Sequence, residues 1–444
     1  MRPEDLILVS VDDHVVEPPT IFDQHLPAQY KDKAPRVVRK KDGSDVWVFQ
    51  GEQIPNIGLN AVVGRPPEEY GMEPTSFEQL RPGTYNIHER IRDMNVNGML
   101  ASMCFPSFPG LCGALFFRQA DKPLAHVILQ AYNDWHIDEW CAAYPGRFIP
   151  LGLLPFWDPQ LVADEVRRIA KKGCHAVTFT ESPDALGLPS LHNPHWDPFW
   201  KACSDEGTVV CIHIGSGAGM KFSSMDAPVD VMITVQPIAC VNCAADLLWS
   251  RVLKDFPNLK IALSEGGIGW IPYFLERADY VHSHHHYWTH QDFGGKQPSQ
   301  VFRDHIITCF IHDPVGVRNR HGIGVDNITW ECDYPHSDTT WPHSPEALAR
   351  SFDGVPDADI NKITHENALR WFRMDPFKHR PKAKCTVGAL RAESPDVDLS
   401  VKTQGGKAPT EGVPRPVTTQ DVLAQLATVY STQPERGCSA SGPT

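Results

Sequence analysis

The sequence predicts an α/β fold in which eight parallel strands close into a barrel. From residue 86 onward, short apolar runs alternate with amphipathic stretches of helical length. The runs are apolar at almost every position, as parallel strands buried on both faces require. The first run is followed by Asp-Asp-His, whereas a doubly wound nucleotide-binding sheet typically has a glycine-rich turn there. A (β/α)8 barrel is therefore favoured over an open sheet.

The individual elements follow from this alternation, and counting the opening run gives eight strands. The expected strands cover residues 6–9, 99–105, 147–154, 176–179, 209–214, 260–263, 306–310 and 328–332. The expected helices cover residues 86–95, 123–144, 159–172, 193–206, 238–256, 268–280 and 314–321. In helix 159–172, for example, Leu161, Val162, Val166 and Ile169 are spaced to form one buried face.

The chain of 444 residues is longer than a simple barrel, which takes roughly 250 residues or more. We expect a barrel domain over residues 1–375 that includes an insertion, 20–85, after the first strand. Two alternating runs around Asp42-Gly43 predict a β-hairpin in this insertion, which we expect to cover or shape a pocket. Residues 376–444 are rich in Pro, Gly, Ser and Thr and predict a C-terminal extension. Its segment 419–430 is expected to form one helix that docks on a neighbouring subunit.

Composition excludes several classes of partner. The net charge is −13 and the basic residues are scattered, so neither nucleic acid nor an anionic membrane is an expected partner. No apolar run approaching a membrane span of about 20 residues is apparent, and the first ten residues do not resemble a signal peptide. The twelve cysteines show no disulfide-like framework, and Cys240 and Cys243 are interpreted as small buried residues of a helix. A soluble, cytoplasmic protein is expected.

Acids and imidazoles stand where the predicted strands end. Asp12 and His14 are two positions apart, and side chains with that spacing point to the same side of an extended chain. Later strand ends contribute His213, Glu265, Glu331, Asp333 and His336. In a parallel barrel the carboxyl ends of all strands meet at one rim, so these side chains are expected to converge.

Each of these residues also has a simpler interpretation. His213 alone is compatible with a core histidine, and Asp333 with a turn before Tyr-Pro. Together, however, several unpaired acids and imidazoles at one dry rim are costly unless a cation or hydrogen bonds compensate. The pattern therefore predicts a metal ion.

The sequence resembles the amidohydrolase superfamily over about residues 6–375. The resemblance rests on Asp12-x-His14, His213-x-Gly215, the segment Leu-Ser-Glu-Gly-Gly-Ile-Gly-Trp at 263–270, and Asp-Tyr-Pro-His at 333–336. The branch it resembles is typified by aminocarboxymuconate-semialdehyde decarboxylase and γ-resorcylate decarboxylase. The resemblance implies a distorted (β/α)8 barrel with one divalent metal ion, commonly zinc and sometimes manganese, and a homo-oligomer, a dimer or larger.

Carried over position by position, the resemblance implies metal ligation by Asp12, His14, His213 and Asp333. Binuclear relatives use a carboxylated lysine at strand four, where this chain has Thr178-Phe179-Thr180, so one ion is expected.

The chain departs from the decarboxylases at two positions. Glu265 replaces their strand-six histidine. Val16 stands where many relatives have a second strand-one histidine, and the following Glu17 either approaches the site or shapes the loop.

The resemblance favours non-oxidative decarboxylation of a small aromatic or unsaturated carboxylic acid. Hydrolysis of an amide, ester or lactone is the alternative, and an inactive barrel that binds a ligand or partner is a third hypothesis. Asp333 is the candidate base, and Glu265 and His336 are candidates for proton transfer. Arg90 is a candidate anchor for a substrate carboxylate, unless it forms ordinary salt bridges on its helix. Trp341 either lines the pocket or packs against it.

Overall fold

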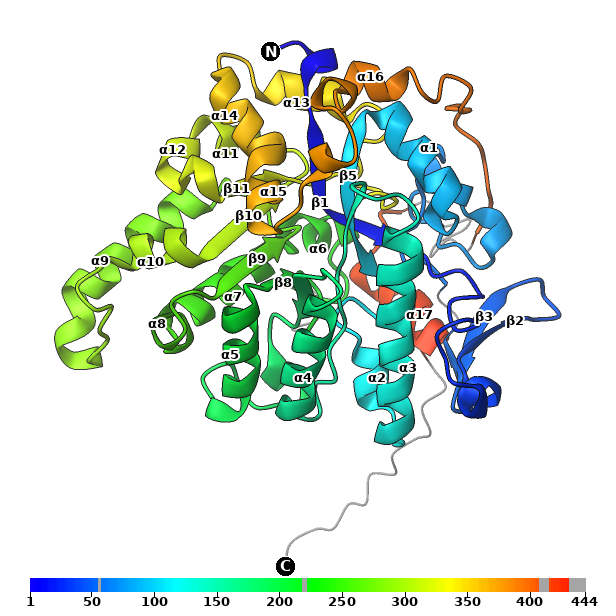
Figure 1. Cartoon of the computed structure of the whole chain (residues 1–444), viewed down its shortest axis with the longest axis horizontal. Coiled ribbons are helices and arrows are strands. Elements are labelled where there is room, and N and C mark those ends of the chain that lie inside the picture. Colours follow the sequence, from blue (N-terminus) through cyan, green and yellow to red (C-terminus); the bar gives the residue numbers. More distant parts are fainter. Residues whose placement is uncertain (55–56, 218–221, 407–414, 431–444) are drawn as a thin grey trace, which may run out of the picture.

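Eight parallel strands form a closed barrel in the computed structural model, which describes residues 1–54, 57–217, 222–406 and 415–430 (Figure 1). They lie in the order β6-β5-β1-β11-β10-β9-β8-β7. Their bounds are β1 Leu8–Val15, β5 Met99–Pro106, β6 Phe148–Ile149, β7 Ala176–Phe179, β8 Val209–His213, β9 Lys260–Ser264, β10 Ile306–Phe310 and β11 Ile328–Trp330. A parallel bridge between Gly152 and Val177 joins the two ends of this order. The predicted (β/α)8 fold is confirmed.

The closing bridge depends on Gly152. Its N–H donates to the Ala176 carbonyl at 2.9 Å, and its own carbonyl accepts from the Thr178 N–H at 3.0 Å. A Cβ at this position would lie 2.2 Å from Ile169 Cδ1, so glycine is needed for the following helix to pack this closely. The strand predicted over 147–154 is short because Pro150 has no N–H for the ladder.

The first strand extends further than predicted. The apolar run 6–9 marked only its beginning, and β1 continues through Asp12, Asp13 and His14 to Val15. Its pairing with β5 is irregular between Ser10 and Asp13, the kind of bulge that re-aims side chains next to active sites. The metal-ligand candidates of this strand therefore stand on rigid sheet and not on a loop.

Helices surround the barrel (Figure 1). Their bounds are α1 Ile87–Asn97, α2 Ala114–Arg118, α3 Lys122–Trp135, α4 Pro159–Ala170, α5 Asp197–Glu206, α6 Val229–Val235, α7 Ile238–Trp249, α8 Val252–Asp255, α9 Ile271–Thr289, α10 Pro298–His305, α11 Pro314–Arg318, α12 Arg320–Ile323, α13 Ser344–Ser351, α14 Asp357–Asn361, α15 Asn367–Trp371 and α16 Val387–Arg391. Local signals set several ends: the Asn86 side chain caps α1 by accepting from two backbone N–H groups, and Gly98 ends it at a φ of 72°. Helix α9 continues nine residues past the predicted end at residue 280, to Thr289.

Small apolar side chains fill the barrel interior, among them Val9, Val11, Ala101, Met103, Cys211, Ala262 and Cys309. A second, larger apolar cluster packs the helices against the sheet, and the fully buried side chains of Trp196, Trp200 and Trp330 belong to it. The rigid barrel therefore presents its polar strand ends on a well-packed base.

The insertion forms its own three-stranded antiparallel sheet, β2 Arg36–Arg39, β3 Asp45–Phe49 and β4 Glu52–Ile54. The turn between β2 and β3 includes Gly43 at a φ of 85°. Further along, the N–H groups of Val62 and Val63 both donate to the Pro335 carbonyl, at 3.1 and 3.0 Å. The insertion thus contacts the loop that follows β11 at the rim.

The C-terminal extension packs on its own chain. The Lys402 N–H donates to the Gly64 carbonyl of the insertion at 2.9 Å. Before the final helix, α17 Thr419–Tyr430, the Val417 carbonyl accepts from the Val229 N–H at 2.8 Å, at the start of α6. The helix predicted over 419–430 is present, and in this structure it contacts α6 of the same chain.

One segment, Val229–Trp249, is long and apolar enough to cross a membrane by length and composition alone, although the sequence analysis expected no such run. It consists of α6 and α7, separated at Gln236-Pro237, and contains Asp230 and Asp246. A third of its most apolar window is buried inside the protein.

Candidate metal centre

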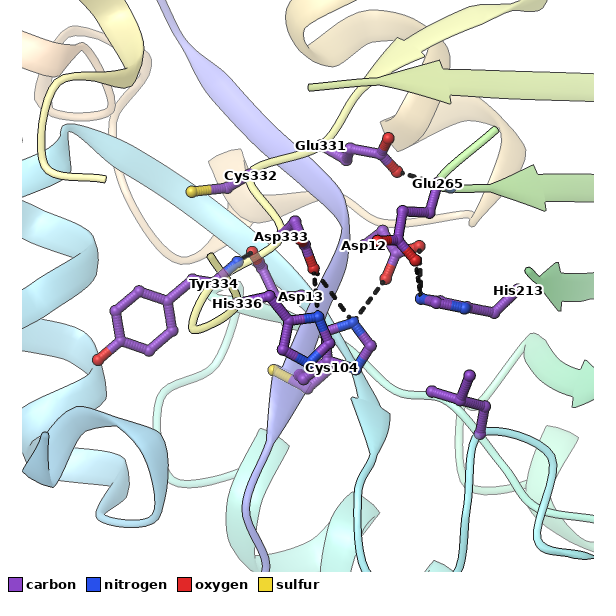
Figure 2. Close-up of polar contacts among 12 residues, drawn as sticks. Asp12, Asp13, Cys104, His213, Glu265, Glu331, Cys332, Asp333, Tyr334 and His336 are labelled. Atoms are coloured by element: carbon purple, nitrogen blue, oxygen red, sulfur yellow. Dashed lines mark hydrogen bonds and ion pairs between the residues drawn. The ribbon is translucent and has the colours of Figure 1, made fainter. Parts of the chain in front are cut away.

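Four side chains meet at the carboxyl rim of the barrel: Asp12 and His14 of β1, His213 of β8, and Asp333, which follows β11. Figure 2 labels Asp12, His213 and Asp333 of this group. His14 Nε2 lies 3.3 Å from Asp333 Oδ1 and 3.7 Å from Asp12 Oδ1. His213 Nε2 lies 3.6 Å from Asp12 Oδ2. We call these four residues the donor cluster. The structure thus brings together all four ligands that the sequence predicted.

The ligating atoms of the donor cluster are buried and unsatisfied. Both carboxylate oxygens of Asp12 and of Asp333, and Nε2 of both histidines, have no hydrogen-bond partner among the described residues. Ligand atoms about 2.1 Å from one ion in a tetrahedral arrangement are about 3.4 Å apart, close to the spacing found here. The donor set, its spacing and its lack of partners therefore fit a divalent metal ion.

The His213 ring is held in the tautomer that a metal ligand needs. Its Nδ1 lies 2.6 Å from the Ile214 carbonyl, so Nδ1 carries the hydrogen and donates it. The lone pair is left on Nε2, which faces Asp12. A backbone carbonyl that orients a ligating imidazole in this way is a common feature of metal sites.

The electrostatics of the cluster keep the imidazoles neutral. Burial lowers the pKa of His213 to about 4, and burial together with the nearby His336 ring lowers the pKa of His14 well below its usual range. Burial raises the pKa of Asp12, and the carboxylates of Glu331 and Glu265 raise it further. Although burial opposes ionisation of Asp333, the His336 and His14 rings hold its pKa below the ordinary value. The site has excess negative charge that a cation would neutralise.

Glu265 and His336 border the donor cluster on the solvent side. Glu265 Oε2 lies 3.1 Å from His213 Nε2, and the Glu265 side chain is 22% exposed. His336 Nδ1 lies 2.9 Å from Asp333 Oδ1, and its ring stacks on His14 with 3.8 Å between the centroids. Both predicted proton-transfer residues therefore lie beside the cluster.

Sequence reasoning noted Glu331 but gave it no role, and it missed Cys309. The Cys309 thiol lies 2.6 Å from Glu331 Oε2, and the same oxygen accepts from the Glu265 N–H at 3.1 Å. Glu265 has a left-handed backbone, with a φ of 60°, so this hydrogen bond holds an unfavourable turn in place. The signal in the sequence that pointed to Glu331 was its position, two residues before Asp333.

A second group of polar and charged residues lies next to the donor cluster, and all of its carboxylate oxygens have hydrogen-bond donors. We call Asp13, Arg81, Arg90, Asp93 and Tyr334 the paired cluster. Asp13 accepts from the Tyr334 N–H at 3.0 Å and from the Ser102 hydroxyl. Asp93 accepts two hydrogen bonds from Arg81, at 2.7 and 2.8 Å, and one from the Tyr334 hydroxyl at 2.5 Å.

The position of Arg90 contradicts the expectation that it contacts a substrate carboxylate. The side chain is fully buried, and its guanidinium donates to the carbonyls of Gly83, at 2.7 Å, and His14, and contacts the Cys104 sulfur. It also lies 4.3 Å from the centroid of the Tyr334 ring. Arg90 therefore supports the backbone of His14 from behind and does not face a substrate.

Trp341 also has a packing position. Its indole N–H donates to the Asp93 carbonyl at 2.9 Å, and the Arg81 guanidinium lies 4.3 Å above its ring. Only 8% of the residue is exposed. Of the two interpretations of this residue, packing against the wall fits better than lining the pocket.

Glu17 shapes the neighbouring loop. Its carboxylate accepts from the N–H groups of Ser107 and Phe108, at 3.0 and 2.7 Å, and from the Tyr132 hydroxyl at 2.8 Å. Both oxygens are thereby used. Glu17 fixes the segment that follows β5 and is not directed at the donor cluster.

A closed parallel barrel with unpaired acids and imidazoles at its carboxyl rim defines a class of metal-binding barrel proteins. The family described as Amidohydrolase matches residues 73–374, about two thirds of the sequence, and the chain belongs to this family.

Individual relatives are distant. The chain is 22% identical over 265 residues to 2-amino-3-carboxymuconate-6-semialdehyde decarboxylase of Dictyostelium discoideum, covering 58% of this chain and 70% of that protein. Its fold is similar to an amidohydrolase of Mycobacterium avium subsp. paratuberculosis K-10, with a TM-score of 0.62, 20% identity, and coverage of 82% and 97%. It is also similar to 5-carboxyvanillate decarboxylase of Novosphingobium aromaticivorans, solved with manganese and 3-methoxy-4-hydroxy-5-nitrobenzoic acid, with a TM-score of 0.57, 17% identity, and coverage of 83% and 97%.

Proposed function

We propose that this protein is a metal-dependent enzyme that removes carbon dioxide, without oxidation, from a small aromatic or unsaturated carboxylic acid. The observation that carries the proposal is the donor cluster, whose buried oxygens and nitrogens have no partner among the described residues. Two of the three relatives compared above are decarboxylases by name, and both are distant in sequence. Family membership supports the metal-dependent class, and the relatives' names support the reaction.

Asp12, His14, His213 and Asp333 are the proposed ligands of one divalent ion. Zinc is the proposed metal, because a mixed set of imidazole and carboxylate donors suits it, and manganese is the alternative. A bound ion would supply Lewis-acid polarisation of a substrate oxygen. With threonine and phenylalanine at the end of β7, the chain offers no lysine there to bridge a second ion.

The remaining roles go to Asp333 and to the residues that border the cluster. Loss of carbon dioxide breaks the bond to the carboxyl carbon, and the carbon left behind takes up one proton. Glu265 is the proposed proton donor, because its carboxyl group is next to the ligands and partly open to solvent. Asp333 is the proposed base as well as a ligand. His336, whose Nδ1 lies 2.9 Å from Asp333 Oδ1, is proposed to exchange protons with it or to contact the substrate.

Hydrolysis of an amide, ester or lactone is the second candidate function. The specific observation in its favour is Glu265 itself, a carboxylate 3.1 Å from His213, at a position where the family resemblance implies a histidine. A carboxylate in that position is well suited to accept a proton from water.

The test is a substrate panel assayed for released carbon dioxide and for hydrolysis products. It contains hydroxybenzoates, unsaturated acids, amides and lactones, with the purified enzyme and with Asp333→Asn. Carbon dioxide from an acid, lost in the variant, supports the proposal. Hydrolysis products alone support the second function, and full activity of Asp333→Asn contradicts the assigned roles. Metal analysis of the purified protein tests the third hypothesis, an inactive binding barrel. A bound ion speaks against that hypothesis, and the lack of one supports it.

We also propose that the enzyme is a homo-oligomer that works in the cytoplasm on a small molecule. Helix α9 carries Tyr273, Tyr280 and Tyr287 at intervals of seven residues, and these rings are 75%, 50% and 80% exposed. Such an aromatic stripe is typical of an interface. The described cysteines are all buried and free, which suits a reducing compartment. Light scattering of the wild type and of Tyr280→Glu tests the oligomer.

A further inference from the structure

A cavity of about 490 Å³ lies at the end of the barrel opposite the donor cluster. Its walls include Leu100 and Arg147, at the starts of β5 and β6, and Pro376, Arg380, Lys384 and Glu393 from the segment after the last barrel helix. We call it the basal cavity. Its volume is within the range of small-molecule sites, and apolar and basic groups both contribute to its lining.

The charges around the basal cavity are unbalanced. Three of the lining residues named above are cationic and one is acidic, in a chain whose net charge is −13. The single acid, Glu393, is already hydrogen-bonded to Arg380. For the Lys384 side chain, the described residues provide no ion pair or hydrogen bond.

Arg147 is the unusual member of this group. It is only 6% exposed, yet no carboxylate lies within ion-pair distance of it among the described residues. Its Nε and Nη2 donate to the carbonyls of Leu100 and Met99, at 2.5 and 3.1 Å, and to the Asn95 side chain at 2.8 Å. Its Nη1 has no acceptor in the described part of the chain. A buried guanidinium without a counter-charge is costly.

Arg380 adds to that cost. Burial, together with the positive charge of Arg380, lowers the pKa of Arg147 to about 10. Arg380 uses Nε on the Lys384 carbonyl and Nη2 on Glu393, and its Nη1 also has no acceptor among the described residues. Two guanidiniums that repel each other, each with a free donor, border the same cavity. An oxyanion between them would accept from both and neutralise the repulsion.

We propose that the basal cavity is a binding site, separate from the donor cluster, for a small organic molecule that carries a phosphate or carboxylate group. The oxyanion is held by Arg147, Arg380 and Lys384, and the apolar body lies against Leu100 and Pro376. Because the cavity joins the barrel to the segment that begins the C-terminal extension, an occupied site fastens the two together.

The test uses the metal-loaded, full-length enzyme and three probes: inorganic phosphate, phenyl phosphate and benzoate. Binding is measured by calorimetry at constant ionic strength, with sodium chloride as the reference salt. The variant is Lys384→Gln, whose exposed side chain makes no hydrogen bond or ion pair with the described residues. The matched control is Lys382→Gln, two residues away, where the ammonium group lies 5.6 Å from the Phe377 ring and does not line the cavity.

We expect saturable binding of at least one probe, weakened about tenfold or more by Lys384→Gln, because a hydrogen bond to a charged group is lost. Lys382→Gln should bind within twofold of the wild type. Preference for phenyl phosphate identifies a phosphate-bearing ligand, and preference for benzoate identifies a carboxylate. Benzoate binding that Lys384→Gln does not weaken belongs to the active site. If no probe binds more weakly to Lys384→Gln than to Lys382→Gln, the proposal is wrong.

Discussion

The donor cluster and the paired cluster are neighbours. The carboxylates of both are buried, but only those of the paired cluster have hydrogen-bond partners among the described residues. They share a strand and a loop, because Asp12 stands beside Asp13 on β1 and Asp333 beside Tyr334 after β11. In the paired cluster two guanidiniums accompany two carboxylates, and every carboxylate oxygen has a donor. In the donor cluster two carboxylates face two imidazoles, and the oxygens of both have no partner in the described chain.

The comparison shows that burial of charge does not by itself mark a functional site. Both clusters contain fully buried acids, and either would be costly without compensation. The paired cluster is compensated by the chain itself, so it is a structural support. The donor cluster lacks internal compensation, so it requires something from outside the chain. Adjacent residues with the same side chain, Asp12 and Asp13, therefore have predictably different roles.

The largest expected effect separates these two aspartates. Asp12→Asn should lower turnover about 1000-fold or more and reduce bound metal well below one ion per chain, because it removes a charged ligand. Asp13→Asn should keep its metal and most of its turnover, and should lose stability, because a hydrogen bond from Ser102 or Tyr334 is impaired. Metal content and kcat of both variants are measured side by side.

Equal loss of metal in the two variants would contradict the division between the clusters. Retention of metal and activity by Asp12→Asn would remove Asp12 from the site altogether. Circular dichroism of each variant is compared with that of the wild type, so that a variant that fails to fold is recognised.

The second effect concerns the proton-transfer role of Glu265. Glu265→Gln keeps the size of the side chain and the backbone N–H that donates to Glu331. It should lower kcat about 100-fold while metal content stays unchanged, since general acid–base catalysis typically contributes a factor of 100 or more. Loss of metal would instead make Glu265 a ligand, and unchanged kcat would exclude it from the chemistry.

Much of the fold was accessible from the sequence because barrel strands are nearly continuous apolar runs. Strands 176–179 and 306–310 were predicted with the bounds that the structure has. The end of β1 was not, because Ser10 and Asp13 are polar and their partners are distant in sequence. The Ser10 hydroxyl accepts from the Cys332 N–H at 2.8 Å, a contact that local sequence does not indicate.

The candidate site shows the same limit. Sequence reasoning selected the donor cluster because its members stand at strand ends, a position that the fold class fixes. It made Arg90 a candidate anchor for a substrate, with ordinary salt bridging as the alternative, because the sequence reveals a charge but not the Gly83 and His14 carbonyls that accept from it. The role of Glu17 was left open for the same reason. Whether a buried polar group is satisfied depends on long-range contacts.

A smaller effect is expected from the paired cluster. Tyr334→Phe removes the hydroxyl that donates to Asp93 at 2.5 Å, while Arg81 continues to hold that carboxylate. The free energy of unfolding should fall by about 1–3 kcal/mol, the usual contribution of a hydrogen bond to a charged group. Denaturant unfolding measures the change, and metal content should remain that of the wild type. Loss of the metal would mean that the paired cluster does more than support the rim.

The smallest effect extends the comparison to histidines. Burial lowers the pKa of His136, in the segment after α3, to about 4, as it does for His213, but His136 belongs to none of the candidate metal-binding groups among the described residues. Below pH 6.5 the unfolded chain binds a proton at His136 that the folded chain does not bind until about pH 4. The free energy of unfolding therefore falls as the pH falls through this window, by about 1.4 kcal/mol per pH unit.

His136→Phe should remove this share of the acid slope with or without the metal, as measured by denaturant unfolding between pH 7.5 and 4.5. The exposed His343, changed to Gln, is the control, and an equal change in both variants would show that burial of His136 is not the cause.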